Sequence, residues 1–458
     1  RMAEVLMRVI EKAIRGSAPA QINVPRDYWT QVIDIELPPI VRLERQAGGV
    51  DAIKKAADLL SKAKFPVILS GAGVVIGGAI EECKKLAEKL DAPVCSGYQH
   101  NDSFPGSHPL AAGPLGYNGS KAGMELISKA DVVLALGTRL NPFSTLPGYG
   151  IDYWPKKASI IQVDMNSDRI GLTKKVTVGI CGDAKLVAQQ LLDQLSPTAG
   201  DTDRQKRKDI IHQTKSAWLQ KLSSLDHEDD DEGTVWNKEA RVRDSDRMSP
   251  RQAWRAIQAG MPEDVIISSD IGNNCAIGNA YPTFEKPRKY LAPGLFGPCG
   301  YGFPSILGAK IGCPDTPVIG FAGDGAFGIS MNEMSSCARE EWPAIAMVIF
   351  RNYQWGAEKR NTTLWFDDNF VGTELDPELS YAKVADACGL KGVTVRTMEE
   401  TTTAIKQSCE DQKKGITTFI EVILNQELGE PFRRDAMKKP VRVAGIKKED
   451  MKPQKGLN

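Results

Sequence analysis

Short apolar runs alternate with amphipathic stretches along most of this chain, and this alternation is the feature that most restricts its fold. The runs VIL (67–69), VVLAL (132–136) and AMVIF (346–350) are apolar at every position. A strand that is apolar on both faces is buried between two layers of helices, so such runs predict parallel sheets. The expected fold class is α/β, with two doubly wound parallel-sheet domains and the tail of a third.

Changes in this pattern divide the chain into five segments. We expect the end of an N-terminal domain with a linker at 1–47, a middle α/β domain at 48–196, a linker at 197–247, a C-terminal α/β domain at 248–432 and a tail at 433–458. The first segment predicts a helix ending at Gly16 and a short strand at 21–25. These read as the last elements of a domain, so we expect a further domain of roughly 100–200 residues to precede them. The linker at 197–247 lacks periodicity and carries the acidic run at 227–232, which predicts a solvated segment.

Composition narrows the class of ligand. The 58 basic and 58 acidic residues cancel, so net charge favours neither a nucleic acid nor a membrane surface, and we expect a small-molecule substrate. No apolar run approaches the roughly 18 residues of a membrane span, and a cytoplasmic location is expected. Nine cysteines without CxxC spacing predict reduced, buried thiols. The last histidine is His227, so chemistry in the C-terminal half proceeds without a histidine from that half.

The segment GAGVVIGG (71–78) follows an apolar run and resembles a dinucleotide-binding loop. Its glycine spacing does not match GxGxxG, so a tight turn between a strand and a helix is the alternative interpretation. The sequence leaves open whether the middle domain binds a nucleotide.

Polar and glycine-rich turns follow three apolar strands of the C-terminal domain. These turns are SSDIGNN (268–274), GDGAF (323–327) and RNYQWG (351–356). In an open parallel sheet ligands bind beyond the carboxyl ends of the strands, so the three turns are expected to face one crevice. Asp324 offers a carboxylate oxygen and Asn352 an amide oxygen, and both suit magnesium when phosphate oxygens complete its shell. A glycine-rich turn with a helix-capping asparagine is the alternative without chemistry.

GDG followed about two dozen residues later by an asparagine at the end of an apolar strand resembles the thiamine diphosphate signature of the acetolactate synthase superfamily, with RN in place of the usual NN. The resemblance extends over essentially the whole chain and implies thiamine diphosphate and Mg²⁺ as cofactors. It implies that magnesium is held by Asp324, Asn352 and the carbonyl of Gln354. The cofactor would further contact Gly272, Asn273, Asn274, Gly323, Gly325, Ala326 and Phe327.

Two more implications of the resemblance concern groups that the chain replaces or does not supply. Cys299 occupies the position of a larger apolar residue that bends the cofactor, so either a bending contact or ordinary packing is expected there. The glutamate that activates the cofactor belongs to the pyrimidine-binding domain, which we expect upstream of this chain, so the catalytic residue is unknown. Two subunits share each active site in relatives, which implies a homodimer or homotetramer.

Longer stretches, among them GYGFPSILGAKIGCPDTPVIGFAGDGAFGISMNEM (300–334), resemble the sulfoacetaldehyde acetyltransferase branch of this superfamily. That resemblance implies conversion of sulfoacetaldehyde and phosphate to acetyl phosphate and sulfite through an acetyl group carried by the cofactor. Candidate contacts to the sulfonate or phosphate are Lys359, Arg360, Arg433 and Arg434, for which a solvated surface role is equally open. The alternatives are an acetolactate synthase or 2-oxoacid decarboxylase of the same superfamily, and a non-catalytic nucleotide-binding or regulatory protein with a degenerate GDG loop.

Overall fold

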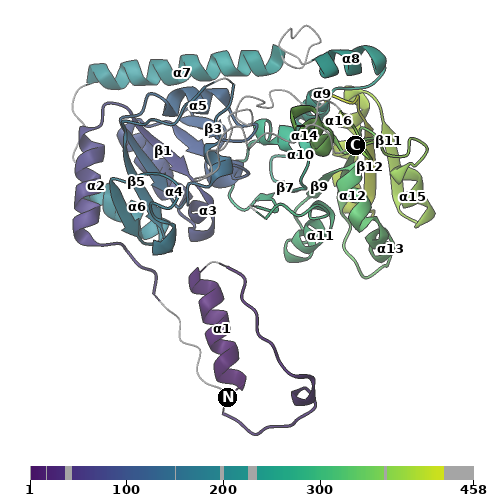
Figure 1. The fold of residues 1–458 in the computed structure, drawn as a ribbon, viewed down its shortest axis with the longest axis horizontal. Coiled ribbons are helices and arrows are strands. Elements are labelled where there is room, and N and C mark those ends of the chain that lie inside the picture. Colours follow the sequence, from purple (N-terminus) through teal and green to yellow (C-terminus); the bar gives the residue numbers. More distant parts are fainter. Residues whose placement is uncertain are drawn as a thin grey trace.

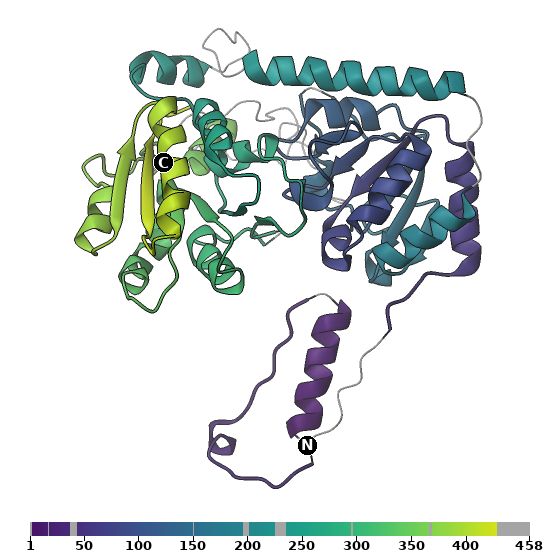
Figure 2. The ribbon, with the colours of Figure 1, turned by 180° about the vertical axis from the view of Figure 1, so that it is seen from behind.

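The computed structural model describes residues 2–16, 18–36, 44–149, 151–195, 201–224, 235–294, 296–365 and 369–427. It contains two six-stranded sheets in which the paired strands run parallel. Helices flank both sheets, which lie next to each other in the molecule (Figures 1 and 2). The predicted α/β fold class is confirmed.

The first sheet has the strand order β3-β2-β1-β4-β5-β6. Its strands are β1 (Pro66–Ser70), β2 (Val94–Ser96), β3 (Ala111–Pro114), β4 (Val132–Leu136), β5 (Ser159–Asp164) and β6 (Val178–Cys181). Its helices are α2 (Val50–Lys62), α3 (Ala72–Gly77), α4 (Ile80–Leu90), α5 (Lys121–Ile127) and α6 (Ala184–Gln194). All five residues of β1 and of β4 are buried, as expected for strands covered on both faces.

The second sheet has the order β11-β12-β10-β9-β7-β8. Its strands are β7 (Ile266–Ser269), β8 (Tyr290–Leu291), β9 (Val318–Gly323), β10 (Ala346–Arg351), β11 (Lys391–Val395) and β12 (Thr418–Ile423). Its helices are α9 (Pro250–Gly260), α10 (Asn273–Ile277), α11 (Gly302–Gly312), α12 (Asp324–Ser330), α13 (Met334–Cys337), α14 (Gly356–Trp365), α15 (Tyr381–Ala387) and α16 (Met398–Gln412). The chain reverses its direction of travel through the sheet between β7 and β9, and a doubly wound sheet opens its binding crevice at such a point.

The strands that the sequence pattern does not predict are the four at the sheet edges. These are β3 and β6 in the first sheet and β8 and β11 in the second. Edge strands are covered less completely than central ones, and β11 (KGVTV) has one buried residue among its five. A continuous apolar run is therefore not required of them, and the signal used for the central strands is missing.

The expected strand at 21–25 is wrong, because the chain there forms neither a helix nor a strand. Strand structure requires a partner for backbone hydrogen bonds, and none of the described strands pairs with this segment. The expected helix is present as α1 (Met2–Gly16), which stands apart from both sheets (Figures 1 and 2).

The linker predicted at 197–247 is largely helical, which corrects the expectation of a solvated segment without periodicity. Helix α7 (Asp201–Ser224) runs beside the first sheet toward the second, and α8 (Val235–Arg243) follows it (Figure 1). The side chains that α7 buries include Arg207, Ile211, Trp218 and Leu222, spaced so that they share one narrow face. The remaining faces of α7 are polar, so the narrow buried face is not evident from the sequence. The acidic run at 227–232 lies outside the described residues.

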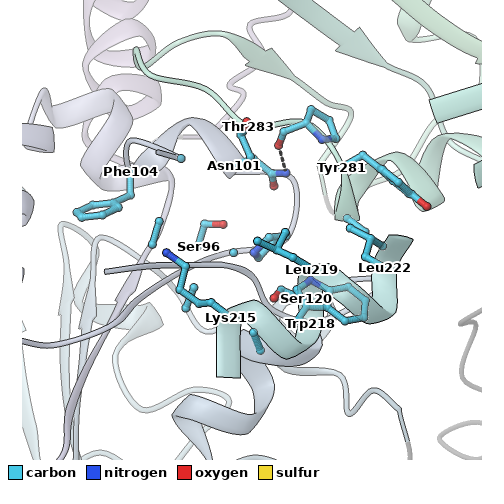
Figure 3. A pocket seen from close by; sticks show the side chains of 18 of the residues that line it. Ser96, Asn101, Phe104, Ser120, Lys215, Trp218, Leu219, Leu222, Tyr281 and Thr283 are labelled. Atoms are coloured by element: carbon cyan, nitrogen blue, oxygen red, sulfur yellow. Dashed lines mark hydrogen bonds between the residues drawn. The ribbon is translucent and has the colours of Figure 1, made fainter. Parts of the chain in front are cut away.

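A cavity of about 340 Å³ lies at the junction of the first sheet, α7 and the second domain (Figure 3). Lys215 and Trp218 of α7 line it together with Phe104 from one side and Tyr281 from the other. The Lys215 amine donates hydrogen bonds to the carbonyls of His108 and Pro109. Helix α7 therefore contributes to the packing between the two sheet domains.

Glycines 71 and 73 explain why the segment at 71–78 resembles a nucleotide loop. A Cβ on Gly73 would lie 2.7 Å from the backbone of Gly137, and a Cβ on Gly71 would lie 2.5 Å from Thr138. The amides of Gly71 and Gly73 donate to the carbonyls of Leu136 and Gly137. These amides are occupied by the loop after β4, so the glycines serve a tight turn between β1 and α3.

Two features of the composition can be compared with the structure. All nine cysteines are free, but Cys299 and Cys313 are exposed and Cys181 and Cys388 are only half-buried, so the expectation that the thiols are buried holds for the other five. Across the described ranges, no helix combines the length and the apolar character that a bilayer crossing demands.

We expect Arg207→Met to lower the free energy of unfolding by about 2–3 kcal/mol, because charge-assisted hydrogen bonds to buried acceptors are lost. The Arg207 guanidinium donates to the carbonyls of Lys64, Leu90 and Asp91 at 2.6–3.0 Å. Urea unfolding followed by circular dichroism measures the change. Lys206→Met, at an exposed position of the same helix, is the control and should leave stability within about 0.5 kcal/mol of the original value. Equal stability of the two variants would contradict the role given to Arg207.

Candidate active site

Strands β7, β9 and β10 are direct neighbours in the second sheet, so their carboxyl ends lie side by side. Three residues separate the end of β7 from the start of α10, and α12 begins immediately after β9. The turn at 351–356 follows β10 and leads into α14. The three turns selected from the sequence are therefore adjacent, at the edge where a doubly wound sheet binds its ligand.

Asp324 is the first residue of α12, and its side chain is almost fully buried. Its Oδ1 accepts a hydrogen bond from the Gly325 amide at 3.0 Å. Its Oδ2 accepts from the Tyr353 amide at 2.7 Å and from the Arg351 guanidinium at 3.1 Å. Burial raises the pKa of Asp324 to about 6, and Arg351 together with the two amides opposes that rise. These contacts hold the carboxylate in one orientation at the end of β9.

The segment that follows β10 presents oxygen atoms without hydrogen-bond partners among the described residues. Asn352 and Gln354 are both buried, and neither Asn352 Oδ1 nor Gln354 Oε1 has a partner there. Gln354 Nε2 donates to the Gln426 carbonyl at 3.0 Å, and the Gln354 main-chain oxygen accepts from Gly356 at 3.0 Å. Tyr353 between them has φ of +60°, a left-handed conformation that costs a non-glycine residue energy and is often found at functional sites.

The turn after β7 adds further unpartnered groups. Asn273 Nδ2 and Asn274 Oδ1 are buried and have no hydrogen-bond partner in the described part of the chain. Gly272 has φ of +132°, and a Cβ placed on it would meet no atom within 4 Å. The turn therefore has open space before it and polar groups within it.

The side-chain amides of the two turns converge on Gly356. A Cβ there would lie 3.4 Å from Asn273 Nδ2, 3.6 Å from Asn352 Nδ2 and 3.7 Å from Gln354 Nε2. A buried polar atom without a partner costs about 1–3 kcal/mol, so these atoms are suited to bind a polar ligand. Carboxylate, amide oxygens and amide donors in one place fit a divalent cation bound to a diphosphate. No group of three or more His, Cys, Asp or Glu side chains that could bind a metal occurs in the described ranges.

The two glycines beside Asp324 have different surroundings. A Cβ on Gly323 would meet nothing within 4 Å, whereas one on Gly325 would lie 2.9 Å from the Trp355 ring. Gly325 is therefore needed for close packing, whereas the space beside Gly323 is open. The next two predicted residues follow in α12: the Ala326 amide lies in its first turn, and the buried Phe327 ring packs 5.5 Å from Phe303.

Cys299 lies in a loop tied to the end of β7 by Asp270, a residue that the sequence analysis did not select. The Asp270 carboxylate accepts hydrogen bonds from the amides of Ile271, Gly300 and Gly302. Cys299 itself is exposed, and partial burial raises the pKa of its thiol. In the sequence, Asp270 lies directly between the last strand residues SS (268–269) and the turn residues IGNN (271–274). A carboxylate at such a position can accept hydrogen bonds from the amides of a neighbouring loop.

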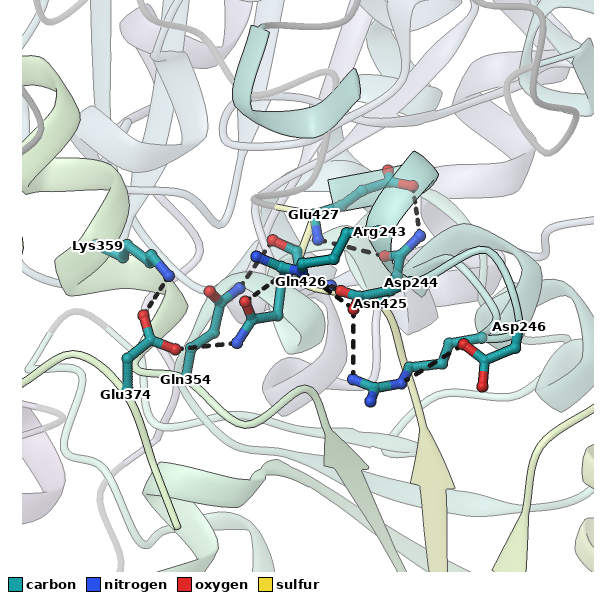
Figure 4. Close-up of polar contacts among 10 residues, drawn as sticks. Arg243, Asp244, Asp246, Gln354, Lys359, Glu374, Asn425, Gln426 and Glu427 are labelled. Atoms are coloured by element: carbon teal, nitrogen blue, oxygen red, sulfur yellow. Dashed lines mark hydrogen bonds and ion pairs between the residues drawn. The ribbon is translucent and has the colours of Figure 1, made fainter. Parts of the chain in front are cut away.

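The predicted anion contacts lie on α14 and in the tail. Lys359 is buried and donates to Glu374, whose second oxygen accepts from Gln426 at 3.0 Å within a larger polar network (Figure 4). Arg360 donates to Asn273 Oδ1, and its guanidinium carbon lies 5.8 Å from the Tyr117 ring centre. Arg360 therefore adjoins the turn after β7, whereas Lys359 joins a network with Gln426. Arg433 and Arg434 lie outside the described residues.

The different surroundings of Gly323 and Gly325 give a matched test. Gly323→Ala should unfold like the original protein but bind thiamine diphosphate at least 10-fold more weakly, because the added methyl group enters the ligand space. Gly325→Ala should lower the unfolding temperature even without cofactor, since its methyl group meets the Trp355 ring. Thermal unfolding and calorimetric titration measure the two effects. Undiminished cofactor affinity in Gly323→Ala would exclude Gly323 from the site.

Family models match most of both sheet domains. The thiamine pyrophosphate enzyme central domain matches residues 53–191, and the thiamine pyrophosphate enzyme C-terminal TPP binding domain matches residues 270–422. The second match spans the turns after β7, β9 and β10 that form the site.

Individual relatives narrow the comparison. The chain is 78% identical over 457 residues to the probable sulfoacetaldehyde acetyltransferase of Rhizobium meliloti, covering all of this chain and 77% of that protein. It is 73% identical to the sulfoacetaldehyde acetyltransferase of Roseovarius nubinhibens, covering 99% of this chain and 75% of the relative. It is 27% identical to the acetolactate synthase large subunit of Corynebacterium glutamicum, covering 99% of this chain and 69% of the relative. The chain belongs to the thiamine pyrophosphate enzymes and, within them, to the sulfoacetaldehyde acetyltransferase family.

Proposed function

We propose that this protein converts sulfoacetaldehyde and phosphate to acetyl phosphate and sulfite. The observation that carries the proposal is the identity of 67–78% to sulfoacetaldehyde acetyltransferases over 99–100% of this chain. The reaction breaks the carbon–sulfur bond and the aldehyde carbon–hydrogen bond. Sulfite leaves with the carbon–sulfur bonding electrons, the aldehyde hydrogen leaves as a proton, a proton adds to the methyl carbon, and a phosphate oxygen joins the acetyl carbon. Bound thiamine diphosphate supplies the carbanion that attacks the aldehyde.

Within this reaction, the chain's own residues bind and orient the diphosphate end of the cofactor. Asp324, Asn352 and the Gln354 carbonyl would hold Mg²⁺, and the proposal is supported by the fixed Asp324 carboxylate and the unpartnered Asn352 Oδ1. Asn273 Nδ2 would donate to a phosphate oxygen, because it is a buried donor without a partner among the described residues. Cys299 would lie beside the cofactor on the loop that Asp270 secures.

Arg360 is the more promising of the two predicted cations on α14. Its guanidinium group reaches Asn273 in the diphosphate turn, and its planar fork suits a sulfonate or a phosphate. Lys359 would act on the site indirectly, because its amine bonds to Glu374 and through it to Gln426, whose carbonyl accepts from Gln354. The tail arginines Arg433 and Arg434 remain candidates from the sequence.

A homodimer or homotetramer with shared active sites is part of the proposal. Large apolar side chains are exposed near the site, among them Phe296 in the Cys299 loop (92% exposed) and Val371 after α14 (81%). Such exposure is typical of surfaces that a partner covers. A second subunit placed there would exclude water from the cofactor.

The metal assignment predicts the effect of Asp324→Asn. Loss of the one carboxylate in the proposed shell should weaken magnesium-dependent binding of thiamine diphosphate at least 100-fold. Isothermal titration with cofactor and Mg²⁺ measures it, and circular dichroism checks that the fold persists. Asp315→Asn, at an exposed position before β9, is the matched control and should bind normally. Unchanged affinity in Asp324→Asn would remove the metal assignment.

The reaction assignment predicts that the enzyme with Mg²⁺, thiamine diphosphate and phosphate releases sulfite from sulfoacetaldehyde and accumulates acetyl phosphate. Arg360→Gln should lower kcat/KM for sulfoacetaldehyde or for phosphate about 10- to 100-fold, as expected when one charge-assisted contact is lost. Arg360→Lys should recover part of the activity. Because Arg360 also contacts Asn273, cofactor affinity is titrated separately.

Exposed Lys383→Gln is the control for this series and should retain the original kinetics. Carbon dioxide from pyruvate without sulfite from sulfoacetaldehyde would replace the proposal with an acetolactate synthase or 2-oxoacid decarboxylase. Absence of any cofactor binding would indicate a non-catalytic protein. Original kinetics in Arg360→Gln would contradict the anion contact alone.

A further inference from the structure

Arg351, the residue that stands in place of the first asparagine of the usual NN pair, is buried against the proposed metal ligand. Its side chain is 1% exposed, and NH1 lies 3.1 Å from Asp324 Oδ2. NH2 donates to the main-chain oxygens of Asp376 and Leu379, the latter at 3.0 Å. The guanidinium group therefore connects the end of β9 to the segment that precedes α15.

Two tyrosines enclose this ion pair. The Arg351 guanidinium carbon lies 4.2 Å from the ring centre of Tyr353 and 5.4 Å from that of Tyr381. Tyr353 donates its amide to Asp324 Oδ2, and Tyr381 donates its hydroxyl to the Asp324 main-chain oxygen at 2.9 Å. Arg351 thus packs on both residues that hold Asp324 in place, including the one with left-handed backbone geometry.

A second carboxylate lies near the guanidinium group but is bound elsewhere. Glu421 is 3.8 Å from Arg351 Nε and accepts hydrogen bonds from the Ser380 hydroxyl at 2.7 Å and from the Tyr381 amide at 3.1 Å. Arg351 therefore makes its close ion pair with Asp324 and a longer one with Glu421. Among the described residues, Arg351 is the cation that forms a close ion pair with Asp324.

The Arg351–Asp324 ion pair affects the order in which a divalent cation and a diphosphate bind. A cation approaching Asp324 also approaches Arg351, and repulsion between two cations is strong where water is excluded. A diphosphate bound at the turns after β7 and β9 adds negative charge that offsets this repulsion. We propose that Arg351 is a positioning residue that fixes the Asp324 carboxylate and, by its charge, makes the site bind a divalent cation only together with the diphosphate. The inference rests on the magnesium site of the proposed function.

Manganese is the probe, because electron paramagnetic resonance counts free Mn²⁺ in a titration without any activity measurement. The protein should bind no Mn²⁺ without thiamine diphosphate in the range where it binds one ion with it. Arg351→Gln should bind Mn²⁺ without the cofactor at least 10-fold more tightly than the original protein does. Arg351→Lys keeps the charge and should keep the dependence on the cofactor, which a purely structural role would not predict. Arg396→Gln, at an exposed arginine, is the matched control and should behave like the original protein.

The possible outcomes distinguish the magnesium site itself from the role of Arg351. Absence of Mn²⁺ binding by the original protein even with thiamine diphosphate would overturn the magnesium site, and this inference with it. Mn²⁺ binding with the cofactor, but equal dependence on it in Arg351→Gln and the original protein, would overturn the role of Arg351 alone. If Arg351→Gln does not fold, judged by circular dichroism, Arg351→Lys decides, since cofactor-independent Mn²⁺ binding by that variant would contradict the proposal.

Discussion

The hydrogen-bond register between β9 and β10 places Gly323 opposite Phe350, so the two strands end at the same level of the sheet. Strand β7 pairs with the other side of β9 and ends beside it, with Ser269 opposite Phe321. Parallel pairing thus brings three segments separated by up to about 80 residues to one edge of the sheet. The contacts of Asp324 with the turn after β10 and of Asp270 with the Cys299 loop depend on this register.

Buried polar groups in these three turns are of two kinds. Asp324 and Asp270 both accept hydrogen bonds from backbone amides, which fix the turns without any ligand. Asn352 Oδ1, Asn273 Nδ2 and Asn274 Oδ1 have no partner among the described residues. The first kind gives the site its shape, and the second makes ligand binding favourable because it removes a cost of burial.

Helix α7 contributes to the packing between the two sheet domains. Its Arg207 binds carbonyls at the end of α4, and its Trp218 packs against Tyr149 at 5.4 Å. Further contacts come from the loops, since Asn101 donates to the carbonyls of Asn279 and Pro282. Arg360 lies near Tyr117 of the first domain, so the packing between the domains reaches the candidate site.

The sequence by itself determined the α/β class and the central strands, because buried parallel strands need continuous apolar runs, and it predicted that three polar turns lie together at one edge of a sheet. It did not determine the edge strands or the helical course of α7, whose burial is partial or confined to a narrow stripe. Only the tertiary structure decided the partners of Arg351, Asp270 and Lys359. A charged residue in a sequence does not reveal which distant residue will lie beside it after folding. In the sequence, Arg351 is only a departure from the usual NN motif. The parallel pairing of β9 with β10 brings its guanidinium group beside the Asp324 carboxylate.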